Sequence, residues 1–146
     1  MGGALPPRDR RAGAVLERMA GLPFADLDGV VQGGTALVLA PHPDDESLGC
    51  GGLIAEACAR GLPPVVVVLT DGAMSHPSSN SHPPDRLRAL RRAEARAAVS
   101  ALGLGSERLH FLGVPDGRAP REGAAMEAVA ARVAELARAC DAGTIL

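Results

Sequence analysis

Three side chains suited to metal-dependent hydrolysis lie next to one another early in this chain of 146 residues. His42, Asp44 and Asp45 follow directly after the short apolar segment 36–40. Imidazole nitrogen and carboxylate oxygen are both zinc ligands, and a catalytic zinc takes three protein ligands and one water. His42 and Asp45 supply two ligands, which leaves Asp44 as the general base that takes a proton from the water. The pattern predicts part of a hydrolytic zinc site.

A second interpretation of the same segment needs no catalysis. Asp44, Asp45 or Ser47 would accept hydrogen bonds from the free amides at a helix N-terminus, as capping residues do. The position of the segment favours the catalytic interpretation, because it follows a buried strand and precedes a glycine-rich helix start.

The elements that position these residues follow from hydrophobic periodicity. Apolar runs typical of buried parallel strands occur at 36–40, 65–70 and 109–112, and another begins at 144. Helical spacing of apolar residues covers 51–60, 85–102 and 122–140, with a short helix over 14–19. Strand and helix in alternation predict an α/β fold with a layered, mostly parallel sheet.

Ligands of such sheets collect at the carboxyl ends of the strands. Three loops are placed there, at 41–50, 71–84 and 113–121. The middle loop is rich in turn-forming residues, so we expect it to contact substrate rather than to support the fold.

Composition narrows the functional class. The net charge of −2 offers no basic surface for nucleic acid, and no apolar run is long enough to span a bilayer. Three widely spaced cysteines match neither a zinc ribbon nor a redox pair, so we expect reduced thiols in the cytoplasm. The length predicts one domain, residues 35–146, after a partly helical N-terminal leader, residues 1–34.

Four segments in order carry a family resemblance: PHPDDESLGCGG at 41–52, LTDG at 69–72, LRRAE at 90–94 and FLGVPDG at 111–117. With them, the chain resembles the zinc-dependent N-acetylglucosaminyl deacetylases of the PIG-L/LmbE family from about residue 36 onward. The resemblance implies a Rossmann-like three-layer sandwich. It also implies hydrolysis of an N-acetyl group from an amino sugar or related glycoconjugate, with release of acetate.

The resemblance also implies roles for particular residues. His42 and Asp45 match the first two zinc ligands and Asp44 the general base. Arg91 and Asp116 match substrate contacts, although a helical Arg three residues before a Glu is also an ordinary solvated ion pair, and Pro-Asp-Gly an ordinary turn. Glu46 either orients this loop from outside the ligand set or meets the helix dipole.

The resemblance covers only the N-terminal portion of the family pattern. The family's third ligand lies in a later His-containing motif after another strand, and this sequence does not contain it. We therefore expect a C-terminally truncated domain in which zinc is weakly held and turnover is slight or absent. An exposed sheet edge would also favour self-association.

The sequence alone leaves two other functions open. The glycines at 49–52, placed at a helix start, suggest a nucleotide or phosphate site, although they lack the spacing of the known fingerprints. The other rival is a non-catalytic remnant or subunit that binds a sugar or a protein partner.

Overall fold

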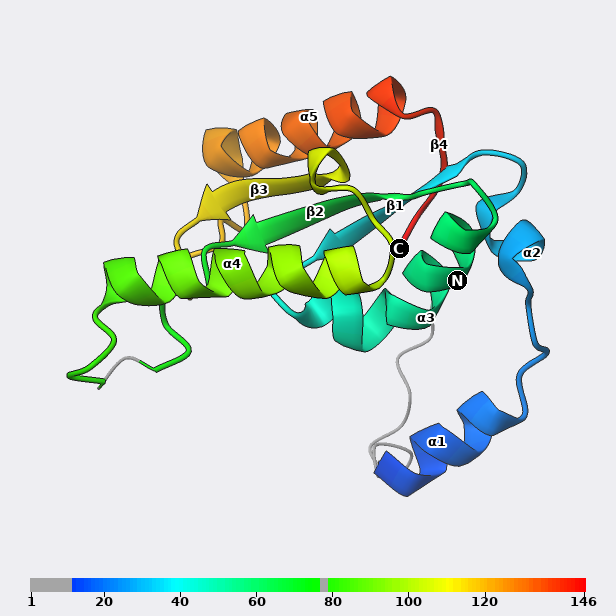
Figure 1. Cartoon of the computed structure of the whole chain (residues 1–146), viewed down its shortest axis with the longest axis horizontal. Coiled ribbons are helices and arrows are strands. Elements are labelled where there is room, and N and C mark those ends of the chain that lie inside the picture. The colour runs from blue at the N-terminus through cyan, green and yellow to red at the C-terminus, as the bar shows by residue number, and fades with distance from the viewer. Residues whose placement is uncertain (1–11, 77–78) are drawn as a thin grey trace.

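The computed structural model describes residues 12–76 and 79–146. Four strands alternate with helices along the chain (Figure 1). The elements in order are α1 (Ala12–Ala20), α2 (Leu27–Val31), β1 (Thr35–Ala40), α3 (Asp45–Ala59), β2 (Val65–Thr70), α4 (Pro84–Ala101), the 3₁₀ turn η2 (Ser106–Arg108), β3 (Leu109–Val114), α5 (Gly123–Ala139) and β4 (Ala142–Ile145).

The strands form a single parallel sheet in the order β3-β2-β1-β4. In the centre of the sheet, Leu37 of β1 pairs with Val65 of β2 and Val38 with Val66. The central strands are almost wholly apolar and buried, as expected for a parallel sheet covered on both faces. The predicted α/β class with a parallel sheet is confirmed.

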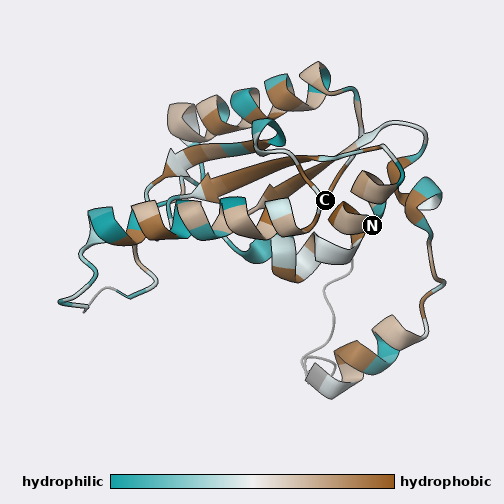
Figure 2. Ribbon diagram, viewed as in Figure 1, coloured by the Kyte–Doolittle hydropathy of each residue, from teal (hydrophilic) through white to brown (hydrophobic). Residues whose placement is uncertain are grey.

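Helices cover both faces of the sheet and make three layers. On one face, Val66 and Val68 pack with Ile54 of α3 and Val99 of α4. On the other face, Val65 and Val67 pack with Leu136 of α5. Alternate residues of β2 thus serve opposite layers. Figure 1 shows α5 on one side of the sheet and α3 with α4 on the other, and Figure 2 shows the apolar strands between them.

The predicted start of α3 at residue 51 is wrong, because the helix begins at Asp45. Glycine is a poor helix former, so the glycines at 49–52 favoured a later start. Two carboxylates in the first turn, Asp45 and Glu46, compensate by interacting with the helix dipole. The glycines therefore lie within the helix rather than at its N-terminus, which removes the basis of the phosphate-site interpretation.

One further helix was not predicted. The short helix α2 begins after Asp26, whose side chain accepts a hydrogen bond of 2.9 Å from the Gly29 N–H. Its Leu27 and Val31 pack on the first strand and on α3. The predicted N-terminal leader ends at residue 34; its residues 1–11 lie outside the described residues, and the boundary stays a prediction.

Strand β4 lies close to the start of β1 because two glycines face each other. A Cβ on Gly34 would lie 2.7 Å from the Gly143 nitrogen, which is closer than real side chains approach. Within the part of the chain that the structure describes, no helix is both long and apolar enough to cross a membrane.

Candidate active site

Loops after β1, β2 and β3 meet at the carboxyl edge of the sheet, as predicted. They bring His42, Asp44, Ser75 and Asp116 around one cavity of about 300 Å³, and Arg91 of α4 completes the wall. The third loop begins later than predicted, because β3 extends to Val114. Residues far apart in the sequence are therefore neighbours at the edge where parallel sheets bind ligands.

The His42 ring lies between two carboxylates. Its Nδ1 is 3.1 Å from Asp45 Oδ2, and its Nε2 is 3.4 Å from Asp116 Oδ1. The Asp45 carboxylate also accepts a hydrogen bond of 3.0 Å from the His42 backbone N–H. The side chain of Asp116 is 11% exposed, whereas those of His42 and Asp45 are 51% and 41% exposed. His42 and Asp45 are thus accessible from solvent, whereas the more buried Asp116 contacts the ring through Nε2.

This donor pair suits two neighbouring positions around zinc. Bonds of about 2.0–2.2 Å in tetrahedral geometry separate two donor atoms by roughly 3.3–3.5 Å, close to the observed His42 to Asp45 distance. Zinc-binding imidazoles commonly direct their second nitrogen to a carboxylate, as His42 does to Asp116. Within residues 12–76 and 79–146, no three His, Cys, Asp or Glu side chains form a metal-binding group. Among the described residues, His42 and Asp45 are therefore candidates for two of the three ligands that a catalytic zinc needs.

Asp44 has a strained backbone. Its φ of 133° and ψ of −26° lie where L-residues are rare, and such conformations cost of order 1–3 kcal/mol. The Asp44 N–H donates to Glu46 Oε2 at 2.9 Å, which fixes the peptide in this orientation. The strained backbone thus belongs to a residue that lines the cavity.

Glu46 is the buried anchor of this loop. Its side chain is 0% exposed, and its second oxygen accepts a hydrogen bond of 2.9 Å from the Ser47 hydroxyl. A buried carboxylate requires such donors. Its contact with the Asp44 N–H corresponds to the predicted orienting role, and its place in the first turn of α3 equally matches the dipole interpretation.

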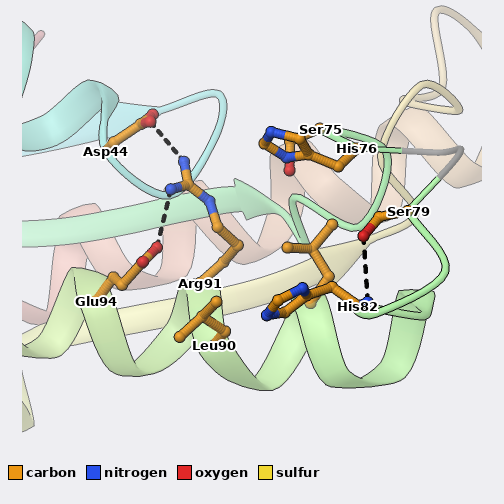
Figure 3. A pocket seen from close by; sticks show the side chains of 9 residues that line it. Asp44, Ser75, His76, Ser79, His82, Leu90, Arg91 and Glu94 are labelled. Atoms are coloured by element: carbon orange, nitrogen blue, oxygen red, sulfur yellow. Dashed lines mark hydrogen bonds and ion pairs between the residues drawn. The ribbon is translucent and has the colours of Figure 1, made fainter.

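Arg91 joins the helix α4 to the loop after β1. One guanidinium nitrogen, Nη2, donates to the carboxylate of Asp44 and to the carbonyl oxygen of Pro43, the latter at 2.6 Å. The other, Nη1, donates to Glu94 at 2.9 Å (Figure 3). The i,i+3 ion pair expected from the sequence is present, and the contact with Asp44 adds a link that helix spacing alone does not predict.

Gly72 packs against the loop after β1. Its φ is +65°, and a Cβ there would lie 3.1 Å from Pro43 Cδ.

Asp71 is a residue of the site that the sequence reasoning did not single out. Its carboxylate is 5% exposed and accepts hydrogen bonds from the backbone N–H groups of Ala73 and Asp116, both at 3.1 Å, and from Arg88 Nε at 2.9 Å. Burial raises the pKa of Asp71, but these three donors outweigh burial and hold it below the usual value. The Asp116 carboxylate in turn accepts from the Met74 N–H at 3.1 Å. The sequence feature that could have identified Asp71 is its position directly after a largely apolar strand.

A larger cavity of about 450 Å³ opens beside this site. It is lined by Asp44, Arg91 and Glu94 on one side and by His76 and His82 of the middle loop on the other (Figure 3). Polar groups from two elements face this space, which suits a ligand with hydroxyl groups.

The chain is similar to known proteins in both sequence and fold. The family model for GlcNAc-PI de-N-acetylase, PIG-L, matches residues 37–145. The chain is 34% identical over 102 residues to the 1D-myo-inositol 2-acetamido-2-deoxy-alpha-D-glucopyranoside deacetylase of Kineococcus radiotolerans, covering 68% of this chain and 28% of that protein.

Two solved structures share the fold. One is N,N'-diacetylchitobiose deacetylase from Pyrococcus horikoshii, with a TM-score of 0.70, 22% identity and coverage of 99% of this chain and 51% of that one. The other is GalB, the 4-carboxy-2-hydroxymuconate hydratase of Pseudomonas putida KT2440, with a TM-score of 0.66, 23% identity and coverage of 77% and 45%.

The chain spans less than a third of the length of the Kineococcus relative and about half of each solved structure. The two solved structures differ in reaction, so the fold alone does not identify the chemistry. The family model spans most of this sequence and includes all of the loops that form the site. The chain therefore belongs to the GlcNAc-PI de-N-acetylase (PIG-L) family.

Proposed function

We propose that this chain forms the part of a zinc-dependent deacetylase that holds the metal and the general base. The observation that carries the proposal is the arrangement of three neighbours: His42 and Asp45 face each other at 3.1 Å, and Asp44 is held in a strained conformation toward the same cavity. The Kineococcus relative is named a deacetylase of an acetamido sugar, which supports the same reaction class.

The residues divide into holding and reacting groups. His42 Nδ1 and Asp45 Oδ2 would hold zinc, while Asp116 keeps the imidazole oriented through Nε2. When bound, zinc would polarise the amide carbonyl and lower the pKa of a water to about 7. With two of three ligands among the described residues, we expect the 146-residue polypeptide to bind zinc weakly and to turn over slowly or not at all.

Asp44 moves the proton in this proposal. Its Oδ2 is paired with Arg91, so we assign Oδ1 as the atom that takes the proton from the attacking water. The same carboxyl then returns the proton to the amide nitrogen as the C–N bond breaks. The products are acetate and a free amine.

The substrate that we propose is an N-acetylated amino sugar or a conjugate of one. Arg91 and Glu94 offer a donor and an acceptor for sugar hydroxyl groups at the larger cavity. The sequence contains no Trp or Tyr on which a sugar would stack, so hydrogen bonds must dominate recognition.

A cytoplasmic location is consistent with the three unpaired cysteines, Cys50, Cys58 and Cys140.

Amide NMR spectra of the 146-residue chain, titrated with N-acetylglucosamine in the presence of zinc, test this proposal. We expect shifts at Asp44, Arg91 and Asp116 and a loss of binding in Arg91→Ala. Arg132→Ala is the matched control, because Arg132 pairs with Glu135 on the exposed side of α5, away from the site. Sugar binding without zinc binding would favour the non-catalytic alternative, and the absence of both would contradict the proposal.

A further inference from the structure

Asp71 divides its hydrogen bonds between its two carboxylate oxygens. Oδ1 accepts from the backbone N–H groups of Ala73 and Asp116, each at 3.1 Å, and Oδ2 accepts from Arg88 Nε at 2.9 Å. The two amides come from different loops, those that follow β2 and β3, whereas Arg88 belongs to α4. Both loops line the cavity that contains His42. A single buried oxygen atom therefore sets how far apart two walls of this cavity lie.

The main chain of Asp71 holds the loop after β3 as well. Its N–H donates to the carbonyl oxygen of Val114, the last residue of β3, at 3.0 Å. The bond from the Asp116 N–H to Oδ1 then fixes the chain two residues later. Because the acceptor of this second bond is a carboxylate, the bond is roughly twice as strong as one between neutral groups. Asp71 thus determines where the backbone of Asp116 lies.

Asp116 transmits that position to His42. Its Oδ1 lies 3.4 Å from Nε2 of the His42 ring, and its Oδ2 accepts a hydrogen bond of 3.1 Å from the Met74 N–H. The side chain is only 11% exposed, so water competes little for these oxygens. Because hydrogen bonding is lost at about 3.6 Å, even a small displacement of Asp116 would release the ring.

We propose that Asp71 is a positioning residue of the zinc site, which holds the His42 ring in its metal-binding orientation through Asp116. This inference rests on the proposed function, in which His42 is a ligand. The hydrogen bonds of the Asp71 side chain end on the two loops and on α4, so its effect on the ring passes through the loop after β3. The property that matters is the place of Oδ1, not the charge of the carboxylate.

Two substitutions separate the place of this oxygen from the charge. Asp71→Glu keeps the charge but moves the carboxylate one methylene farther from the backbone, out of register with the two amides. Asp71→Asn removes the charge but keeps an oxygen where Oδ1 lies. Groups that orient a zinc-bound imidazole typically change metal affinity 10–100-fold when they are mutated. We expect a loss of about tenfold in Asp71→Glu, because Asp71 acts one contact farther away, and we expect Asp71→Asn to retain most of the affinity.

Zinc titration calorimetry measures these affinities, and urea unfolding checks that each variant is folded under the same conditions. If the longer side chain of Asp71→Glu prevents folding, Asp71→Ser takes its place with the same expected loss, since a serine hydroxyl is too short to reach both amides. A larger loss in Asp71→Asn than in Asp71→Glu would show that the charge matters rather than the position, and would overturn the inference.

A combined variant tests the path through Asp116. In an Asp116→Ala background there is no carboxylate left to position, so the loss caused by Asp71→Glu should disappear. Effects of residues that act independently add instead. Additive losses of zinc affinity would therefore contradict an action through Asp116.

The His42 ring supplies a readout that needs no metal. In the zinc-free chain, we expect the carbon-bound ring protons of His42 to shift in NMR spectra of Asp71→Glu and to keep their positions in Asp71→Asn. Equal zinc affinity and unchanged ring signals in both variants would overturn the inference and leave the proposed function intact. The expected ring shifts in a chain that binds no zinc would support the positioning of His42 by Asp71 while refuting the proposed function.

Discussion

The strained backbone of Asp44 predicts that a glycine at this position relieves strain while it removes the proposed general base. With φ 133°, Asp44 occupies a conformation that glycine adopts without a steric penalty. We compare Asp44→Gly with Asp44→Ala, because both remove the carboxylate and its ion pair with Arg91. The difference between the two variants therefore reports the backbone strain.

The magnitude follows from two opposing contributions. Relief of the strain contributes about 1–3 kcal/mol in favour of glycine. The greater freedom of glycine in the unfolded chain subtracts about 0.5–1 kcal/mol. Asp44→Gly should therefore be more stable than Asp44→Ala by about 1 kcal/mol, within limits of roughly 0 and 2.5 kcal/mol.

Urea unfolding measures this difference directly. With a typical slope of about 2 kcal/mol per M, a gain of 1 kcal/mol raises the midpoint by roughly 0.5 M. Ala97→Gly on the exposed face of α4 is the control, and it should lose about 1 kcal/mol, as glycine does in an ordinary helix. An Asp44→Ala variant at least as stable as Asp44→Gly would show that the backbone of Asp44 stores no such strain.

Three further predictions concern the groups around Asp44. In urea unfolding, Glu46→Ala should cost about 2–4 kcal/mol, because it removes two hydrogen bonds to a buried carboxylate, and Glu46→Gln less, because one acceptor oxygen remains; equal losses would contradict this. Gly72→Ala should be about 1–2 kcal/mol less stable than Gly117→Ala, since both have positive φ but only the first crowds Pro43. The lowered pKa of Asp71 stabilises the fold above its unfolded value, near 3.8, and this contribution disappears as the pH falls through the lower folded value. The stability gap between wild type and Asp71→Asn should therefore narrow below about pH 4, and a constant gap would refute the shift.

Much of the fold follows from local patterns in the sequence. The run from Val65 to Leu69 is continuously apolar and marks a central strand. The apolar spacing within 85–102 and 122–140 gives α4 and α5 to within one residue at each end. These elements are long and strongly periodic, and each must bury one face against the sheet. Helix α3 was placed too late because its glycines outweighed the two carboxylates of its first turn.

The composition of the site was predictable, but its geometry was not. The sequence indicates that His42, Asp44 and Asp45 lie together, because they follow one strand. It does not indicate that Asp116 supports the His42 ring, since that contact requires three loops to fold against one another. Asp71 lies in the LTDG segment, but its role was not predicted, because two of its three donors are backbone groups that no side-chain motif encodes.

Zinc titration calorimetry separates the proposed role of His42 from that of Asp44. The 146-residue chain, His42→Ala and Asp44→Asn are titrated with zinc chloride under the same conditions. We expect Asp44→Asn to bind zinc with nearly the affinity of the wild type, because the proposed ligands do not include Asp44, and we expect His42→Ala to lose binding. Equal loss of binding in both variants would contradict the assignment of His42 as ligand and Asp44 as base.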